Sequence, residues 1–345
     1  MKEKTSNRGA KNAEGRKAIL FLMASFAMGQ SWVVQESGTT ASLRGVSAVD
    51  SKVVWASGTK GTYLRTTDGG ASWKVLTVPG AADLDFRAIR AFDEKTAYLL
   101  STGPGEKSRV YKVVNDQAKL LFTSPDPKGF FDALSFWDTS HGIILGDPVD
   151  GRFVIFTTSD GGETWKRQKT PSALPDEGAF AASNTCLITK GAREVWFGTG
   201  GARVFHSTDG GETWTVAKTG MRSGASAGIF SLAFSGKTGI AVGGDYSKPA
   251  EASGNIALTG DGGKTWATRA SGPGGYRSAI AYIESRKTWI AVGTSGSDVS
   301  TDNGNSWRNF DSGNYNALSI AGNDGWAVGP KGAIARLHLP PGPID

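Results

Sequence analysis

The sequence predicts an all-β protein, a seven-bladed β-propeller of four-stranded antiparallel blades in which the N-terminal strand closes the last blade. Three observations lead to this prediction. One turn motif recurs along the chain, strand-like alternation flanks each copy, and the last period lacks one strand, which a segment near the N-terminus supplies. The 48 Gly and 11 Trp, beside only 4 Met, are typical of short strands joined by tight turns.

The first element is residues 1–29, which we predict to be a secretory signal peptide. Six Lys or Arg and two Glu accompany an apolar run of 11 residues from Ala18 to Met28. Crossing a bilayer takes about 20 residues, so this run is too short, and the small residues Ala27 and Gly29 suit cleavage before Gln30. We expect an exported protein, periplasmic or secreted, and an uncleaved anchor is the alternative.

Charge and cysteine content limit the kinds of partner and of covalent attachment that we expect for the mature chain. The formal net charge of +6 falls to +2 when the six cations and two anions of residues 1–29 are removed, so nothing favours nucleic acid as a partner. Cys186 is the only cysteine, which excludes an intramolecular disulfide and a lipid-bearing cysteine after the apolar run. We expect a monomer without a transmembrane span or cofactor, with residues 30–340 forming the propeller and 341–345 a tail.

The repeated motif reads Ser/Thr-x-Asp-x-Gly-x-Ser/Thr-Trp. Its aspartates lie 92, 49, 52 and 41 residues apart, and the first gap is close to two periods, which predicts a degenerate copy near residue 116. Residues 109–116 fit, because a strand-like run there ends in Asp116 but lacks the Gly pair and the Trp. The five full copies carry the pairs Asp68 and Trp73, Asp160 and Trp165, Asp209 and Trp214, Asp261 and Trp266, and Asp302 and Trp307.

Each motif is predicted to be the turn of a β-hairpin. Gly adopts positive φ, the Asp side chain accepts hydrogen bonds from turn amides, and the Trp covers the turn. Successive blades place these aspartates about 50° apart around the rim, too far for two of them to share a substrate. We therefore assign the aspartates a structural role.

The strands follow in order within each period. In the first period, 43–49 and 53–57 precede the hairpin formed by 61–66 and 73–78. The last period has only three strand-like runs, at 317–320, 325–328 and 333–337. Residues 31–36 match the strand that follows each motif, yet no motif precedes them. We infer that they complete the last blade, which closes the ring and removes its open edge.

The motif is the signature of the Asp-box (BNR) repeat superfamily, which includes sialidases and sortilin-type propellers, and the chain resembles it over nearly all of the mature sequence. The chain resembles in particular the photosystem II stability and assembly factor family of cyanobacteria and chloroplasts, whose blades read like 43–50, 54–58 and 61–65, and again like 326–334. The resemblance implies an exported assembly chaperone that holds a membrane-protein subunit through a basic face. The missing lipoprotein cysteine departs from many cyanobacterial members and leaves membrane attachment open.

Function is expected on the face opposite the motif turns, where the loops leading into each blade and those between its second and third strands surround the axis. Basic residues outnumber carboxylates there, so this face should attract a protein partner with an acidic segment. The alternative is that these are ordinary solvated charges. The carboxylates on these loops are Asp85, Asp132, Asp147, Asp176, Glu177 and Asp245. The predicted partner-binding residues are Arg44, Arg87, Arg109, Arg152, Arg203, Arg222, Arg277, Lys60, Lys331, Tyr276 and Tyr315.

A sialidase-type glycosidase is the competing hypothesis. Such enzymes hold a sugar carboxylate with three arginines beside a Tyr nucleophile. The candidates here are Arg44, Arg222, Arg277, Tyr315, Glu177 and Asp85. Around Arg44 only the Arg of the sialidase pattern is kept, and no acidic residue adjoins Tyr315 in sequence. The three His residues form no spaced pair with Cys186, so no metal site is predicted. We expect a binding protein rather than an enzyme.

Overall fold

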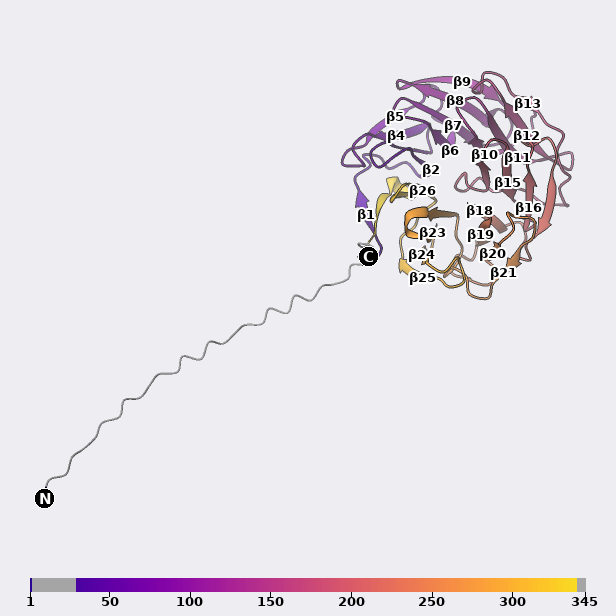
Figure 1. The fold of residues 1–345 in the computed structure, drawn as a ribbon. Helices are drawn as coiled ribbons and strands as arrows, with labels where there is room; N and C mark the ends of the chain where they lie inside the picture. The colour runs from indigo at the N-terminus through magenta and orange to yellow at the C-terminus, as the bar shows by residue number, and fades with distance from the viewer. Residues whose placement is uncertain (2–28, 340–345) are drawn as a thin grey trace.

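The computed structural model describes residues 1 and 29–339 of the 345-residue chain. Nearly all of the predicted signal peptide and the predicted tail fall outside the described residues. Seven four-stranded sheets are arranged around a central axis (Figure 1), and every pairing between neighbouring strands is antiparallel. The predicted seven-bladed propeller is thereby confirmed.

The first four blades follow the chain in order, each running from its innermost to its outermost strand. Blade 1 contains β2 (Leu43–Ala48), β3 (Val54–Gly58), β4 (Thr62–Thr66) and β5 (Lys74–Thr77). Blade 2 contains β6 (Asp85–Ala91), β7 (Thr96–Thr102), β8 (Arg109–Val114) and β9 (Gln117–Thr123). Blade 3 contains β10 (Phe131–Phe136), β11 (Gly142–Val149), β12 (Arg152–Thr158) and β13 (Lys166–Arg167). Blade 4 contains β14 (Leu187–Lys190), β15 (Glu194–Gly198), β16 (Arg203–Ser207) and β17 (Thr215–Lys218).

The remaining three blades complete the ring. Blade 5 contains β18 (Ala227–Ser235), β19 (Thr238–Asp245), β20 (Ile256–Thr259) and β21 (Ala267–Thr268). Blade 6 contains β22 (Ala279–Ile283), β23 (Thr288–Gly293), β24 (Gly296–Ser300) and β25 (Arg308–Asp311). Blade 7 contains β26 (Ala317–Ala321), β27 (Asp324–Val328), β28 (Ile334–His338) and, as its outermost strand, β1 (Ser31–Gln35). Three short 3₁₀ turns cover Gly105–Lys107, Glu284–Arg286 and Pro330–Gly332.

The two ends of the described chain close the ring together, as the sequence predicted. Strand β1 pairs with β28 in a register that places Trp32 opposite Leu337. The indole Nε1 of Trp32 also donates a 2.9 Å hydrogen bond to Ser297 Oγ of blade 6, and its ring packs 5.5 Å from that of Tyr315. Blade 7 is therefore joined to its own N-terminal strand and, through that strand, to blade 6.

Each full motif closes its own turn by the same set of hydrogen bonds. In the first copy, the Thr66 hydroxyl donates to Asp68 Oδ1 at 2.7 Å and accepts from the Gly70 amide, while Ser72 donates to Asp68 through both its amide and its hydroxyl. The φ of +89° at Gly70 favours glycine. The other four full copies repeat these bonds, which agrees with a structural role for the aspartates.

The degenerate copy is a tight hairpin turn without the motif. Asn115 and Asp116 both adopt positive φ, of 50° and 64°, which matches the two-residue turn between β8 and β9. The Asp116 carboxylate pairs with Arg65 and Lys74 of blade 1, at 2.8 and 2.7 Å. It therefore joins neighbouring blades rather than closing a turn of its own.

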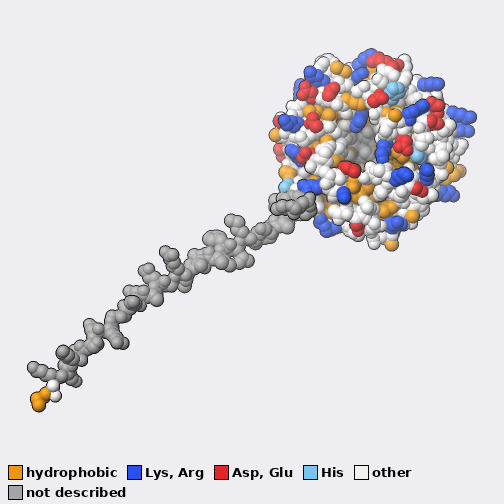
Figure 2. Space-filling model, in the orientation of Figure 1, with side chains coloured by type: hydrophobic (Ala, Val, Ile, Leu, Met, Phe, Trp, Pro, Cys, Tyr) orange, Lys and Arg blue, Asp and Glu red, His pale blue; other side chains and the backbone are white. Residues whose placement is uncertain are grey.

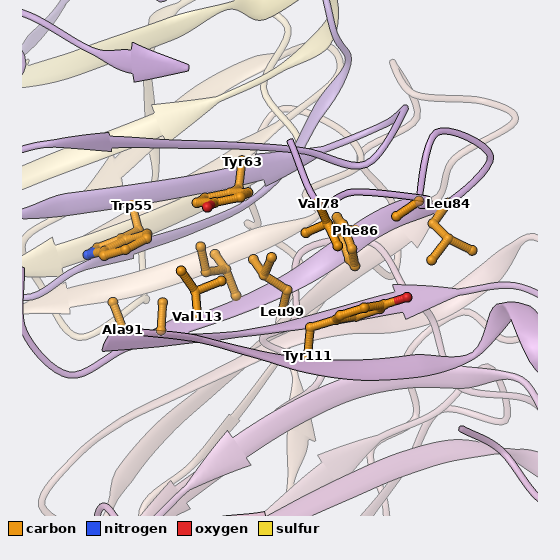
Figure 3. Close-up of a cluster of buried hydrophobic side chains, with 12 residues drawn as sticks. Trp55, Tyr63, Val78, Leu84, Phe86, Ala91, Leu99, Tyr111 and Val113 are labelled. Atoms are coloured by element: carbon orange, nitrogen blue, oxygen red, sulfur yellow. The ribbon is translucent and has the colours of Figure 1, made fainter. Parts of the chain in front are cut away.

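The hydrophobic core lies between the blades. Between blades 1 and 2, Trp55 and Tyr63 from one sheet face Phe86, Leu99 and Val113 from the next (Figure 3). All five side chains are essentially inaccessible to solvent. Because similar clusters fill the other spaces between sheets, each blade is stabilised mainly by its two neighbours.

Hydroxyls on the innermost strands satisfy free backbone amides of the adjacent blade. Ser47 Oγ accepts from the Ala91 amide at 3.0 Å, Ser319 Oγ from the Ala48 amide at 3.0 Å, and Ser231 Oγ from the Ile280 amide at 2.9 Å. Asn184 Oδ1 plays the same role for the Leu134 amide. The inner edges of the sheets therefore need no further strand.

Candidate functional site

A pocket of about 420 Å³ lies where all seven blades meet, on the face opposite the Asp-box turns. Every blade or the segment that leads into it contributes to the walls, so the pocket sits on the axis of the ring. We call it the axial pocket. It is lined by Arg44, Arg87, Phe130, Asp132, 179–182, Phe230, Tyr246, Tyr276, Ser278, Thr294 and Asn316.

The segment before β14, residues 178–184, reaches across the axis, and we call it the axial loop. The Ala179 amide donates to Asp147 Oδ1 of blade 3 at 2.9 Å. The Ala181 carbonyl accepts from Arg44 Nη2 at 3.5 Å and from Arg87 Nη1 at 3.3 Å. On the other side, Ser183 Oγ donates to the Ser278 carbonyl of blade 6 at 2.6 Å. The axial loop thus forms a floor for the pocket.

Two arginines converge on this floor from neighbouring blades. Burial lowers the pKa of Arg44, and the like charge of Arg87 lowers it further. Arg87 is partly balanced by Asp85, whose carboxylate accepts from its Nε at 2.8 Å. The Nε of Arg44 is buried and has no hydrogen-bond partner among the described residues. The pair therefore keeps one unused donor, for which an anionic group would be the strongest acceptor.

Asp132 is the most unusual side chain of the pocket. It is 1% exposed, and neither carboxyl oxygen has a hydrogen-bond partner among the residues that the structure describes. Burial raises its pKa well above the ordinary value, and the carboxylate of Asp147 raises it further while Arg87 opposes this. Burial likewise raises the pKa of Asp147 to about 6, against the hydrogen bond from the Ala179 amide. Sequence reasoning identified both residues only as loop carboxylates.

An aromatic wall faces these charges. Phe180 of the axial loop stacks on Phe230 with ring centroids 3.8 Å apart and planes 9° from parallel. Tyr276 meets Phe230 edge to face at 4.8 Å, and Tyr246, which is 52% exposed, forms the outer rim. Phe180 and Phe230 were missed in the sequence, because neither belongs to a repeated motif or to a charged loop.

Three of the predicted partner-binding residues lie together in the axial pocket, namely Arg44, Arg87 and Tyr276. Lys60 and Lys331 are exposed in turns at positive φ, and Arg152 is exposed at the start of β12. Arg109 is half-buried and bonds to the Glu106 carbonyl. These four residues lie outside the pocket lining, on turns of the same face.

The other four predicted residues already pair or pack with partners inside the fold. Arg277 is fully buried and paired with Asp298 at 2.5 Å, and Arg203 is paired with the buried Glu177. Arg222 makes two hydrogen bonds to the Glu251 carboxylate. Tyr315 is 6% exposed and packs against Trp32, and burial raises its pKa to about 12. Sequence position alone does not reveal these pairings, because each partner lies on a different strand or loop.

The six side chains that a sialidase-type site would need are not brought into one pocket. Of these six, only Arg44 lines the axial pocket. Arg222, Arg277 and Glu177 are held in the separate ion pairs described above, Asp85 pairs with Arg87, and Tyr315 lies in the core between blades 6 and 7. The arrangement therefore gives no support to a carboxylate-binding arginine triad with a Tyr nucleophile.

The described part of the chain gives no support to a cysteine nucleophile, a metal site or a membrane-spanning helix. Cys186 is fully buried, and burial raises the pKa of its thiol, so it behaves as a core side chain. Across residues 29–339, no three His, Cys, Asp or Glu side chains form a cluster suited to a metal ion. No helix in the same range has the length and apolar character needed to cross a membrane.

Figure 2 shows that one face of the molecule carries acidic and basic side chains interspersed around a central hollow. Such a surface lacks a broad field of one sign, so charge-based recognition depends on local groups. The Arg44 and Arg87 pair is such a group, because both side chains line one pocket.

Comparison of the sequence with protein families gives one match. A model of the BNR/Asp-box repeat matches residues 205–216, which include the motif between β16 and β17. No curated protein matches the chain in sequence. The repeat type inferred from the five motifs is therefore confirmed.

Solved structures share the fold along most of the chain. YCF48 bound to D1 peptide matches with a TM-score of 0.63 and 17% identity, covering 88% of this chain and 96% of its own. YCF48 from Cyanidioschyzon merolae matches with a TM-score of 0.63 and 19% identity, covering 89% and 98%. At these identities the likeness is one of fold, which confirms the predicted resemblance at that level. Because 1020 chains of known structure match, function must be argued from the site itself.

Proposed function

We propose that this propeller is an exported binding protein that engages a protein partner through the face around the axial pocket. Arg44 and Arg87 carry the contact, with Lys60, Arg109, Arg152 and Lys331 on the surrounding turns. The observation that supports this most is the convergence of two arginines from neighbouring blades on one pocket whose aromatic rim includes the exposed Tyr246. Exposed aromatic and arginine side chains are the residue types that dominate binding energies at protein interfaces.

The partner is expected to present an acidic segment. Arg44 has an unused, buried Nε donor, and a carboxylate is its best acceptor. YCF48, whose fold this chain shares, has been solved with D1 peptide bound, which supports a peptide-binding role for the same architecture. We further propose that the partner is a membrane-protein subunit met outside the cytoplasm, as the predicted signal peptide and the family resemblance imply.

The experiment is partner capture by purified protein with reversed charges. Arg44→Glu with Arg87→Glu should reduce capture from an envelope extract at least tenfold. Lys237→Glu with Lys264→Glu is the matched control, because both lysines are exposed on the Asp-box face and the charge change is the same. Unchanged capture by the first variant, with its circular dichroism spectrum intact, would remove the axial face from the proposal.

Export is tested separately. Mass spectrometry of the protein recovered from its native host should show a chain that begins at Gln30. A chain found intact in the cytoplasmic fraction would contradict export without affecting the binding site.

A further inference from the structure

Two buried polar groups of the axial pocket, one a donor and the other a carboxyl group, lack hydrogen-bond partners among the described residues. Arg44 Nε is a buried donor without an acceptor, and Asp132 is a carboxyl without a donor, within the described residues. Buried polar groups in folded proteins are nearly always hydrogen-bonded, so two unpaired groups in one pocket need an explanation. A ligand that carries both an acceptor and a donor would satisfy both.

The pocket has the size and walls of a small-molecule site. Its volume of about 420 Å³ lies within the usual range of roughly 300–1,000 Å³ for such sites. Phe180 and Phe230 provide an apolar wall from blades 4 and 5, while the charged groups come from blades 1 to 3. A molecule inside it would therefore meet charges on one side and aromatic rings on the other.

We propose that the axial pocket binds a free α-amino acid with an apolar side chain. Its carboxylate is held by Arg44 and Arg87, its ammonium group pairs with Asp132, and its side chain lies against Phe180 and Phe230. This inference goes beyond the proposed protein partner, since it assigns a second kind of ligand to the pocket at the centre of the binding face.

The charge balance of the pocket favours a zwitterion over a simple anion or cation. Asp85 already pairs with Arg87 at 2.8 Å, and Asp132 adds a further carboxyl group to the pocket wall, where the charge of Arg87 acts on it. A simple carboxylate would leave Asp132 without a cationic partner, and a simple amine would bring a third cation to the two arginines. Only a ligand with both charges matches both sides.

The test is isothermal titration calorimetry with four probes on the full mature chain. L-Phenylalanine is compared with 3-phenylpropionate, which lacks the ammonium group, 2-phenylethylamine, which lacks the carboxylate, and N-acetyl-L-phenylalanine, which resembles a peptide C-terminus. We expect L-phenylalanine to bind at least tenfold more tightly than each of the other three.

Variants assign the contacts. Asp132→Asn keeps the side-chain volume and should abolish the preference for L-phenylalanine over 3-phenylpropionate, whereas Arg44→Gln should abolish the preference over 2-phenylethylamine. Asp150→Asn is the control, because Asp150 is an exposed carboxylate in the turn between β11 and β12, outside the pocket lining, and should bind like the wild type.

Several outcomes would overturn the inference. Absence of binding by all four probes at millimolar concentration would do so, as would equal binding of 3-phenylpropionate or of N-acetyl-L-phenylalanine. If a variant fails to fold, the four-probe series on the wild type still decides. Partner capture is measured in a separate experiment. If no amino acid binds but the Arg44 and Arg87 variant still loses partner capture, the amino-acid site is ruled out and the proposed protein-binding function stands.

Discussion

The guanidinium of Arg87 in blade 2 donates a 3.3 Å hydrogen bond to the carbonyl oxygen of Ala181, which precedes the inner strand of blade 4. Blades 2 and 4 are not neighbours in the ring, so this contact reaches across the central axis. Arg44 of blade 1 donates to the same carbonyl at 3.5 Å. The arginines that we assign to binding therefore also hold the floor of their own pocket.

Removing both guanidinium groups should loosen the axial loop without unfolding the ring. In Arg44→Met with Arg87→Met, we expect amide hydrogen exchange in residues 178–184 to become about tenfold faster, since two long hydrogen bonds from charged donors are lost. The exposed pair Lys60→Met with Lys331→Met serves as the control. Exchange rates equal to the wild type would show that Asp147 and Ser278 hold the loop alone.

The closing strand should contribute strongly to stability. Trp32→Ala removes the hydrogen bond to Ser297 and the packing against Tyr315, and we expect a loss of about 3 kcal/mol, the low end for a buried Trp, because Trp32 is half-buried. Val34→Ala lies on the same strand at 73% exposure and should change the free energy of unfolding by less than about 0.5 kcal/mol. Urea denaturation measures both, and equal effects would contradict closure through Trp32.

The Asp-box aspartates should make stability fall only in strong acid. Hydrogen bonds from the Thr164 hydroxyl and amide and from Thr158 lower the pKa of Asp160 to about 2. A carboxyl whose folded-state pKa is depressed stabilises the fold above its unfolded value near 4, and this contribution is lost as the pH falls towards 2. Asp160→Asn should therefore flatten the acid limb of the stability curve below pH 4, measured by urea midpoints, and a parallel curve would contradict it.

The sequence predicts the repeated features of the fold well because their causes are local. Asp68 with its neighbouring Gly pair specifies a turn by itself, and Trp32 matches the Trp that ends each full motif, so the closing strand could be identified from one segment. Phe180 and Ala181 could not be placed in the same way. They lie in a segment that replaces the first part of the inner strand of blade 4 and has no counterpart in the repeat.

The candidate site was only partly predictable for a related reason. Arg277 corresponds in blade position to Leu43 rather than to Arg44, because the amides of Leu43 and Arg277 both donate to a Gly carbonyl of the preceding blade. Arg277 is therefore buried, where Asp298 neutralises it, whereas Arg44, one position further along, lines the axial pocket. Such a pairing depends on which carboxylate the neighbouring strand provides at that depth. The environment of Asp132 depends likewise on Asp147 and Arg87, which lie on other strands.

Asp132 should lower stability at neutral and higher pH. Its folded-state pKa is raised by burial first, so the protonated form is the one the fold favours, and stability falls as the pH rises above the unfolded value near 4. Each unit by which the folded-state pKa exceeds the unfolded-state pKa lowers the free energy of unfolding by about 1.4 kcal/mol at high pH. Asp147, with a pKa raised to about 6, acts in the same direction.

We therefore expect Asp132→Asn to be more stable than the wild type at pH 8 and to lose less stability between pH 4 and pH 8. Thermal unfolding at a series of pH values tests this. A variant that is less stable than the wild type at pH 8 would show that the carboxylate is paired within the fold.

The central claim, that a partner protein docks over the axial pocket, is tested most directly by photo-crosslinking from its rim. A benzophenone amino acid replaces Tyr246, which is 52% exposed at the pocket edge, or Lys264, which is exposed on the opposite face. We predict one discrete adduct from position 246 that disappears when Arg44 and Arg87 are changed to Glu, and none from position 264. An adduct from position 264 alone, or one from position 246 that survives the charge reversal, would contradict the account.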